Sequence, residues 1–504
     1  MIVRTVILTL LTVISMVSAS SPAAAQACTA GTESDFDGDG ASDLAIGDPD
    51  ATVSGQARAG RVHIAYGDGT TLTIDAGDIP DNDNGAGERF GYAMDTVDWN
   101  GDGCTDLFIG VPFENWSNNT LFEAGLVVYI PGSPAGLDTS LARNWSQTTL
   151  GEDYHEAGDR FGWDLAAGLD TEGEPFLVIG VPGEDTTNAE GEVLEDIGRG
   201  IYVRPGGAAR FDQNSAGFSD SVEPGDMFGY SVAASASGFV VGVPGEDAEY
   251  GTGTIHDVGT VFLIDHDDAA SSPPQLSAWG QASTGISGVY EDGDMYGYSL
   301  DIVDYISTGG GAPRMMIAVG APGEAIGSDT SSGLSMALWS SGAGVTQYKN
   351  ISQDVDKNPG DSTEPGDMFG ATVAMVNRTP NQNTSTDTLL MAAGAPGEDD
   401  SGLTNVGEIG LFSMVEAETS GGDPVRGLLE DAGLDLTDGN AIGSVLHTTR
   451  THLWVTVRSE TDPAVYGVPW DNIVAGGTDP VLTRTPVDFG LTAADTASFG
   501  ASLA

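Results

Sequence analysis

Short runs of apolar residues alternate with turns rich in glycine and acidic residues along most of the chain. Examples are "FLVIGVPGED" from Phe176, "FVVGVPGED" from Phe239 and "LLMAAGAPGED" from Leu389. Each run has the length of one buried β-strand and ends in a Gly-x-Pro turn, where proline ends the strand because it has no N–H to donate to a ladder. Helical periodicity is almost absent after residue 27. The pattern therefore predicts an all-β protein.

These strands belong to a repeat that starts with an aromatic residue followed by glycine. The aromatic position is occupied at Phe90, Phe161, Phe228, Tyr296, Phe369 and Phe499. A weaker copy, Ile442-Gly443, fills the one double-length gap, so the mean spacing is about 68 residues, which accommodates four strands with long loops. We expect a seven-bladed β-propeller of four-stranded blades over residues 28–504, with each aromatic side chain wedged between adjacent sheets.

The first and last repeats are each incomplete. The turn Gly47-Asp48-Pro49 has no Phe-Gly strand before it, and Phe499-Gly500 has no Gly-x-Pro turn after it. If both ends of the chain supply strands to one blade, the ring closes and leaves no strand edge free to pair with another chain. We therefore expect the C-terminal strand to join the N-terminal blade.

The N-terminal segment has the features of a secretory signal peptide. Arg4 precedes an apolar run from Val6 to Val17, and small residues end at Ala25-x-Ala27. We expect a cleaved signal over residues 1–27 and a secreted, extracellular, monomeric protein without membrane insertion. Two cysteines, Cys28 and Cys104, follow the signal, and one disulfide is the simplest expectation for an exported chain.

The charge balance is strongly acidic. Seventy-five acidic and 17 basic residues give a formal net charge of -58. Such a surface disfavours nucleic acid and anionic membranes as partners, and it suits cations, basic partners or a salty medium. Solubility alone also explains this charge.

Two acidic loops have the spacing of a calcium site. "DFDGDGASD" and "DWNGDGCTD" carry side-chain oxygens at positions 1, 3, 5 and 9 and glycine at position 6. Ca²⁺ takes about six to eight oxygen ligands, and a tight turn lets alternate side chains and the carbonyl of position 7 converge on one ion. We expect two Ca²⁺ sites, formed by Asp35, Asp37, Asp39, Ala41 and Asp43 and by Asp98, Asn100, Asp102, Cys104 and Asp106. The later repeats have lost this pattern, as in "DTEGEP" from Asp170.

The combination of Phe-Gly, D-x-[DN]-x-D-G-x-x-D and Gly-Ala-Pro resembles the FG-GAP repeats of the integrin α-subunit head, and within that family the stand-alone secreted propellers of bacteria. The resemblance spans essentially the whole chain after the signal. It implies a seven-bladed propeller with Ca²⁺ in the hairpin between the first two strands of some blades, held by the side chains of the two loops above. It does not carry integrin heterodimerisation or signalling to this chain, because a shared fold does not fix function.

We find no Gly-x-Ser-x-Gly elbow, His-Glu-x-x-His helix or phosphate-binding loop in the sequence. The expected function is therefore non-catalytic recognition or adhesion, with an extracellular protein or glycan as ligand. The alternatives are a secreted carbohydrate-active hydrolase or lyase on a propeller scaffold, and a passive assembly scaffold. Tryptophans such as Trp99 and Trp163 either pack between blades or stack on sugars.

The face opposite the metal loops is expected to be acidic. The turns before Phe-Gly and after Gly-x-Pro lie one strand away from those loops, and they collect Glu156, Asp159, Glu184, Asp185, Glu223, Asp226, Glu246, Asp247, Glu291, Asp294, Glu324, Glu364, Asp367, Glu398 and Asp399. We expect a ring of carboxylates there. It is either a set of water-exposed polar turns or a surface that binds cations or a basic ligand.

Overall fold

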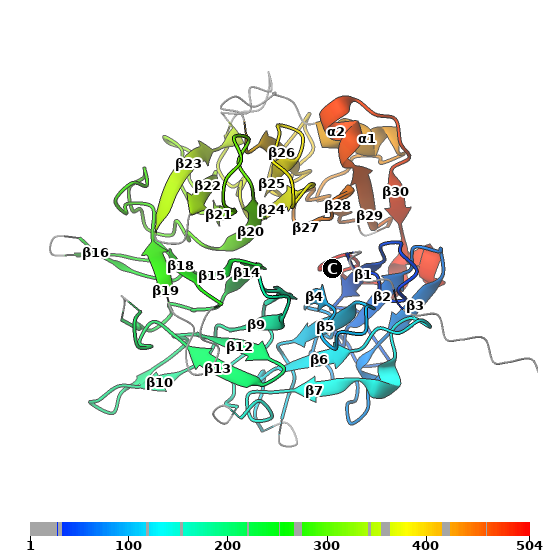
Figure 1. Ribbon diagram of the computed structural model, residues 1–504, viewed down its shortest axis with the longest axis horizontal. Coiled ribbons are helices and arrows are strands. Elements are labelled where there is room, and N and C mark those ends of the chain that lie inside the picture. The colour runs from blue at the N-terminus through cyan, green and yellow to red at the C-terminus, as the bar shows by residue number, and fades with distance from the viewer. Residues whose placement is uncertain are drawn as a thin grey trace, which may run out of the picture.

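Seven antiparallel sheets surround a central axis in the computed structural model (Figure 1). The structure describes residues 28, 33–116, 120–151, 155–218, 221–250, 253–266, 275–340, 344–353, 363–415, 424–459 and 461–504. The expected signal peptide lies outside these residues. Within them, no helix is long and apolar enough to cross a membrane. The fold is the seven-bladed β-propeller that the repeat predicts.

Blades 2 to 5 each contain four strands, which are named in order from the axis outwards. Blade 2 contains β4 (Ala93–Val97), β5 (Asp106–Val111), β6 (Leu126–Ile130) and β7 (Arg143–Trp145). Blade 3 contains β8 (Leu165–Leu169), β9 (Pro175–Val181), β12 (Arg199–Arg204) and β13 (Gly207–Phe211). Blade 4 contains β14 (Ser231–Ser235), β15 (Gly238–Val243), β18 (Thr260–Ile264) and β19 (Gln275–Trp279). Blade 5 contains β20 (Ser299–Tyr305), β21 (Arg314–Ala321), β22 (Leu334–Ser340) and β23 (Val345–Ile351).

The other three blades vary this plan. Blade 6 contains β24 (Thr372–Asn377), β25 (Leu389–Ala395) and β26 (Glu408–Ser413), followed by the helix α1 (Pro424–Asp431). Blade 7 contains β27 (Leu446–Thr448), β28 (His452–Val457), β29 (Ala464–Pro469), the helix α2 (Trp470–Ala475) and β30 (Leu482–Arg484). Blade 1 contains β1 (Leu44–Asp48), β2 (Arg61–Ala65) and β3 (Thr71–Ile74). Two small hairpins, β10 (Thr186–Thr187) with β11 (Val193–Leu194) and β16 (Ala248–Tyr250) with β17 (Gly253–Ile255), extend from blades 3 and 4.

The C-terminal residues complete blade 1 on its inner side. The Ala45 N–H donates to the Ala504 carbonyl at 2.8 Å, and the Gly47 N–H donates to the Ser502 carbonyl at 2.9 Å. Ile46 and Leu503 form an antiparallel bridge, and the C-terminus lies near the axis beside β1 (Figure 1). The ring is therefore closed by strands from both ends of the chain, as the incomplete repeats predict.

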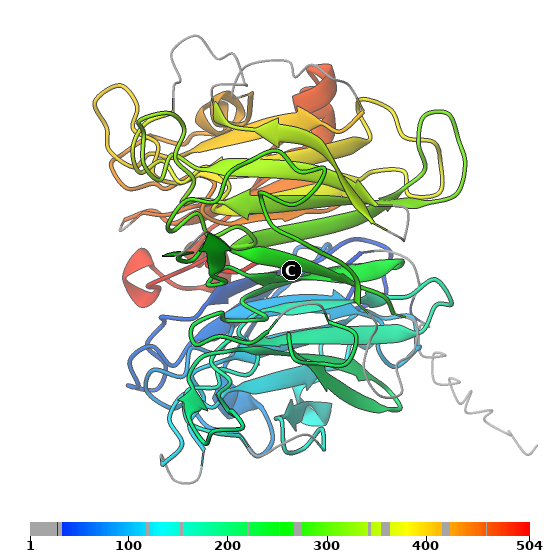
Figure 2. The same ribbon diagram turned by 90° about the vertical axis from the view of Figure 1, so that its left-hand side faces the viewer.

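The hydrophobic core lies between adjacent blades. Phe90, Phe161 and Phe228 are fully buried, and each forms a parallel bridge with a glycine that precedes the third strand of the preceding blade. The weak repeat behaves in the same way, because Ile442 is fully buried and bridges Gly407. The side view shows the sheets running through the disc, with connecting turns at both faces (Figure 2). We call the face that carries the loops between the first two strands of each blade the hairpin face, and the opposite one the Phe-Gly face.

Candidate metal centre and axial pocket

The two acidic loops have the same backbone conformation. Gly38 and Gly40 have φ of +67° and +93°, and Gly101 and Gly103 have φ of +75° and +92°. Only glycine adopts such values without strain, so the spacing of the glycines fixes the shape of both loops. The carboxylate at position 1 then accepts backbone N–H groups from its own loop in each case, at 2.9 Å from Gly40 in the first loop and 2.9 Å from Gly103 in the second.

The carboxylate at position 9 ties each loop to the rest of its blade. Asp43 accepts from the Gly67 N–H at 2.8 Å, and Asp106 accepts from the Gly132 N–H at 2.8 Å and from the Tyr129 hydroxyl at 3.0 Å. Asp43 and Asp106 are both buried. These bonds hold one carboxylate of each loop beneath the turn, in a fixed position relative to the other oxygens.

The first loop gathers uncompensated carboxylates. Oxygens of Asp35, Asp37 and Asp43 all lie within 4.8 Å of one another. Burial raises the pKa of Asp43 to about 7, and the charges of Asp37 and Asp35 act in the same direction. Burial also raises the pKa of Asp106 to about 6 in the second loop. An all-oxygen donor set of this kind suits a hard cation such as Ca²⁺ better than a transition metal.

The disulfide ties the second loop to Cys28, which packs against Gly38 of the first loop. Cys28 and Cys104 are bonded, with their Cα atoms 5.1 Å apart and a sequence separation of 76, so the predicted pairing is confirmed. Asp102 lies beside these sulfurs, but disulfide sulfurs are not thiolate ligands. The Thr105 N–H also donates to the Asp35 carbonyl at 2.8 Å. In the chain-entropy view, a cross-link over this separation adds about 4 kcal/mol of stability.

An arginine occupies the hairpin of blade 3, where the metal pattern is lost. Asp170 accepts from the Glu172 and Glu174 N–H groups at 2.8 and 3.0 Å, much as the first aspartate of a metal loop does. The Arg204 guanidinium lies 2.8 Å from the same carboxylate. Although burial acts in the opposite direction, these partners hold the pKa of Asp170 below its usual value. Sequence reasoning missed Arg204, whose only signal is its place at the end of the third strand, opposite the altered loop.

The expected ring of exposed carboxylates on the Phe-Gly face is wrong for seven of its fifteen residues. Seven of those residues are buried, namely Asp159, Glu184, Asp226, Glu246, Asp294, Asp367 and Glu398. The aspartates accept a backbone N–H three residues earlier, as Asp159 does from Glu156 at 2.6 Å. The glutamates accept from a glutamine of the preceding blade, as Glu184 does from Gln147 at 2.7 Å. The glutamates therefore link neighbouring blades, whereas the aspartates hold their own turns.

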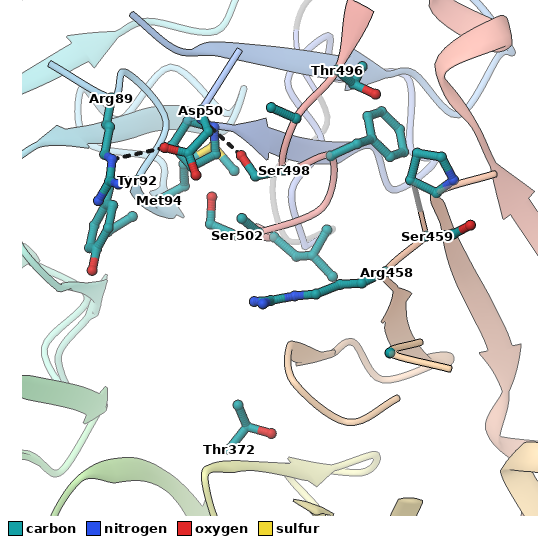
Figure 3. Close-up of a pocket in the computed structure, with 18 of the residues that line it drawn as sticks. Asp50, Arg89, Tyr92, Met94, Thr372, Arg458, Ser459, Thr496, Ser498 and Ser502 are labelled. Carbon is teal, nitrogen blue, oxygen red and sulfur yellow. Dashed lines mark hydrogen bonds and ion pairs between the residues drawn. The ribbon is translucent and has the colours of Figure 1, made fainter. Parts of the chain in front are cut away.

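A pocket of about 1280 Å³ opens around the axis on the Phe-Gly face (Figure 3). One wall is aromatic and is formed by Tyr92, Trp163, Tyr230 and Tyr298. The other walls carry small and polar side chains from blades 6, 7 and 1, including Thr372, Ser459, Ser498 and Ser502. The metal loops lie on the opposite face, so the pocket and the candidate metal sites are separated by the length of the inner strands.

Comparison with known proteins identifies the repeat. The FG-GAP repeat family matches residues 90–129. Phosphatidylinositol-glycan-specific phospholipase D of Bos taurus is 32% identical over 158 residues, which are 30% of this chain and 18% of the enzyme. Integrin alpha-PS2 of Drosophila melanogaster is 36% identical over 165 residues, which are 30% of this chain and 11% of the integrin. The chain thus matches less than one fifth of either relative. The solved Dos1 propeller aligns over 78% of this chain and 70% of its own, with 9% identity and a TM-score of 0.36.

Proposed function

We propose that this FG-GAP propeller, integrin-α-like in its repeats and fold, is an extracellular recognition module that has no catalytic activity and is stabilised by two Ca²⁺ ions. The observation that carries the proposal is the separation of two features. A pocket lined by several blades opens on the Phe-Gly face, whereas both candidate metal loops lie on the hairpin face. Calcium in those loops would hold the ring in shape and leave the pocket free for a ligand.

Side-chain oxygens of Asp35, Asp37, Asp39 and Asp43, with the Ala41 carbonyl, would hold one ion. The second ion would take side-chain oxygens of Asp98, Asn100, Asp102 and Asp106 and the Cys104 carbonyl. The bound ion would supply positive charge where carboxylates converge, so it would stabilise the folded state by an amount that rises with the logarithm of the free Ca²⁺ concentration above the dissociation constant.

Substitution in the second loop tests the calcium proposal. Asp98→Asn should abolish most of the stabilisation by Ca²⁺ at that site, because the position-1 carboxylate contributes charge as well as oxygen. Asp170→Asn is the matched control, since Asp170 holds the equivalent place but pairs with Arg204. Thermal melts with Ca²⁺ and with chelator should differ for the wild type and for Asp170→Asn, and differ less for Asp98→Asn. A wild-type melt that chelator does not change would contradict both calcium sites.

Hydrolysis is the competing function, because the relatives include a phospholipase D. A binding screen of residues 28–504 against glycans, cell-wall polymers and matrix proteins separates the two. Binding with unchanged ligand after long incubation supports recognition. Release of smaller products from a polysaccharide or a glycan-anchored lipid would show that the protein is an enzyme. If neither binding nor product release is detected, an assembly scaffold is the remaining function.

A further inference from the structure

The axial pocket carries an aromatic wall that the repeat itself generates. Tyr92, Trp163, Tyr230 and Tyr298 occupy one position, two residues after the aromatic of Phe-Gly, in four consecutive blades. Successive ring centroids lie 4.9, 5.5 and 5.1 Å apart. The rings are half-buried, so they form a continuous arc that still faces the pocket.

The same repeat position is small in the other three blades. It holds Ala371, Ser444 and Ala501, so the pocket is open opposite the aromatic arc. Hydroxyl groups stand on that side: Thr372 donates to the Gly443 carbonyl at 2.5 Å and Ser502 donates to the Gly91 carbonyl at 2.7 Å. Because their protons are already committed, these oxygens are left as acceptors for a ligand's hydroxyl groups.

Among the described residues, one cation that lines the pocket has no ion-pair partner. Arg458 extends into the pocket (Figure 3). Its side chain is exposed and has no hydrogen bond or ion pair with any of the residues that the structure describes. Arg89, in contrast, lies 3.0 Å from Asp50.

The carboxylates that line the pocket are already engaged elsewhere. Asp50 pairs with Arg89. Asp164 accepts from the Val232 N–H at 2.8 Å, and Asp438 accepts from the Thr404 N–H at 2.8 Å. Arg458 is therefore the group in this pocket that is available to an anion, and a guanidinium binds a carboxylate with two parallel hydrogen bonds.

We propose that the axial pocket binds a carboxylated saccharide, with the sugar rings against the aromatic arc and one carboxylate on Arg458. The proposal rests on the recognition function above and names its ligand class. Aromatic faces accept the apolar faces of sugar rings, and phenol groups at the wall supply polar partners. A neutral ligand would bring no negative charge to pair with the Arg458 guanidinium.

Calorimetric titration tests the proposal with trimers of galacturonate, glucuronate and mannuronate, each beside its methyl ester. At least one acid should bind, and its ester at least about tenfold more weakly, because a hydrogen-bonded charge pair is lost. Arg458→Gln should lower the affinity for the acid by the same factor and leave the affinity for the ester unchanged. Arg143→Gln, a substitution of equal charge on the outer strand β7, should have no effect. Trp163→Ala should lower the affinity for both the acid and the ester, because the aromatic arc contacts the sugar rings of both.

Three results would overturn the proposal. In the first, Arg458→Gln and the wild type bind the acid with equal affinity. In the second, none of the trimers binds. In the third, a tri-aspartate peptide binds more tightly than any saccharide. Melting curves of each variant establish that it is folded. If no trimer binds but the wild type keeps its Ca²⁺ dependence and binds another ligand in the screen, the recognition function survives and this inference alone fails.

Discussion

At the scale of single residues, glycine sets how closely the blades approach. Gly60 has φ of +86°, and a Cβ built there would lie 2.3 Å from the backbone N and O of Phe90. Phe90 in turn is fully buried between blades 1 and 2. The glycine and the aromatic of the repeat are therefore two halves of one contact, made across a blade boundary.

Gly60→Ala should be strongly destabilising, by about 3 kcal/mol or more, because the Phe90 backbone must move as well as the glycine. Gly69→Ala provides the control. Gly69 has φ of +89° but nothing within 4 Å of a built Cβ, so only the left-handed backbone penalty of about 1 kcal/mol applies. Chemical denaturation of both variants gives the two values. Equal losses would mean that the close approach to Phe90 does not matter.

The metal loops and Arg204 differ in how far sequence can predict them. Each loop is contiguous, so the spacing of its oxygens and glycines predicts the shared shape of Asp35 to Asp43 and Asp98 to Asp106. The pairing of Arg204 with Asp170 joins strand β12 to the loop between β8 and β9, so the partner of Asp170 is known only once the register of blade 3 is known. The calcium itself stays a prediction.

At the scale of elements, the Phe-Gly and Gly-x-Pro motifs located the inner two strands of blades 1 to 6, because the first motif precedes the inner strand and the second ends its neighbour. In blade 7 the Gly-x-Pro sequence at Gly467 ends the third strand, β29, instead. The burial of the acidic turns could not be predicted from a sequence motif, because it depends on which turns pack against each other. Asp159 and Glu184 are separated by a whole hairpin in sequence, yet the N–H of Gly183 donates to the Asp159 carbonyl. A charged residue in a turn looks exposed until the packing of the neighbouring turn is known.

These turns should make the fold less stable as pH rises. Burial first, and then the charge of Glu184, raise the pKa of Asp159 to about 8. The unfolded chain loses this proton near its ordinary pKa of 3.8, so between those values the folded state binds more protons. The free energy of unfolding therefore falls as pH increases from about 4 to about 8, by up to about 1.4 kcal/mol per pH unit for such a group.

Asp159→Asn tests this prediction because the amide keeps an oxygen for the Glu156 N–H and does not ionise. Urea unfolding between pH 5 and pH 8 should show a shallower loss of stability for this variant than for the wild type. Asp435→Asn, at an exposed position, removes the same charge and should keep the wild-type slope. If the two variants behave alike, the general charge of the surface explains the pH dependence.

At the scale of the whole molecule, stability depends on the contact between the two ends. Phe499 is buried in a cluster with Leu44, Ile46 and Trp454, which joins blades 7 and 1. The Thr456 hydroxyl donates to the Gly500 carbonyl at 2.6 Å and adds a direct link from blade 7 to the closing strand. No other segment of the described chain contributes an inner strand to blade 1.

Deletion of residues 497–504 should abolish cooperative unfolding and promote association, since β1 would then present a free edge. Size-exclusion chromatography and thermal melts would detect both effects. A peptide of the same eight residues, added in trans, should restore the melting curve and elution volume of the full-length protein, and the same peptide with Phe499→Ala should not. A truncated protein that melts like the wild type would contradict the closing role of this strand.

The shared blade also imposes an order on biosynthesis. The strands of blade 1 emerge first during synthesis, and their inner neighbour, residues 501–504, is the last part of this sequence to be made. Every other blade has its inner strand before its outer ones. The inner edge of β1 therefore stays unpaired in the nascent chain until residues 501–504 have been made, after the strands of the six other blades.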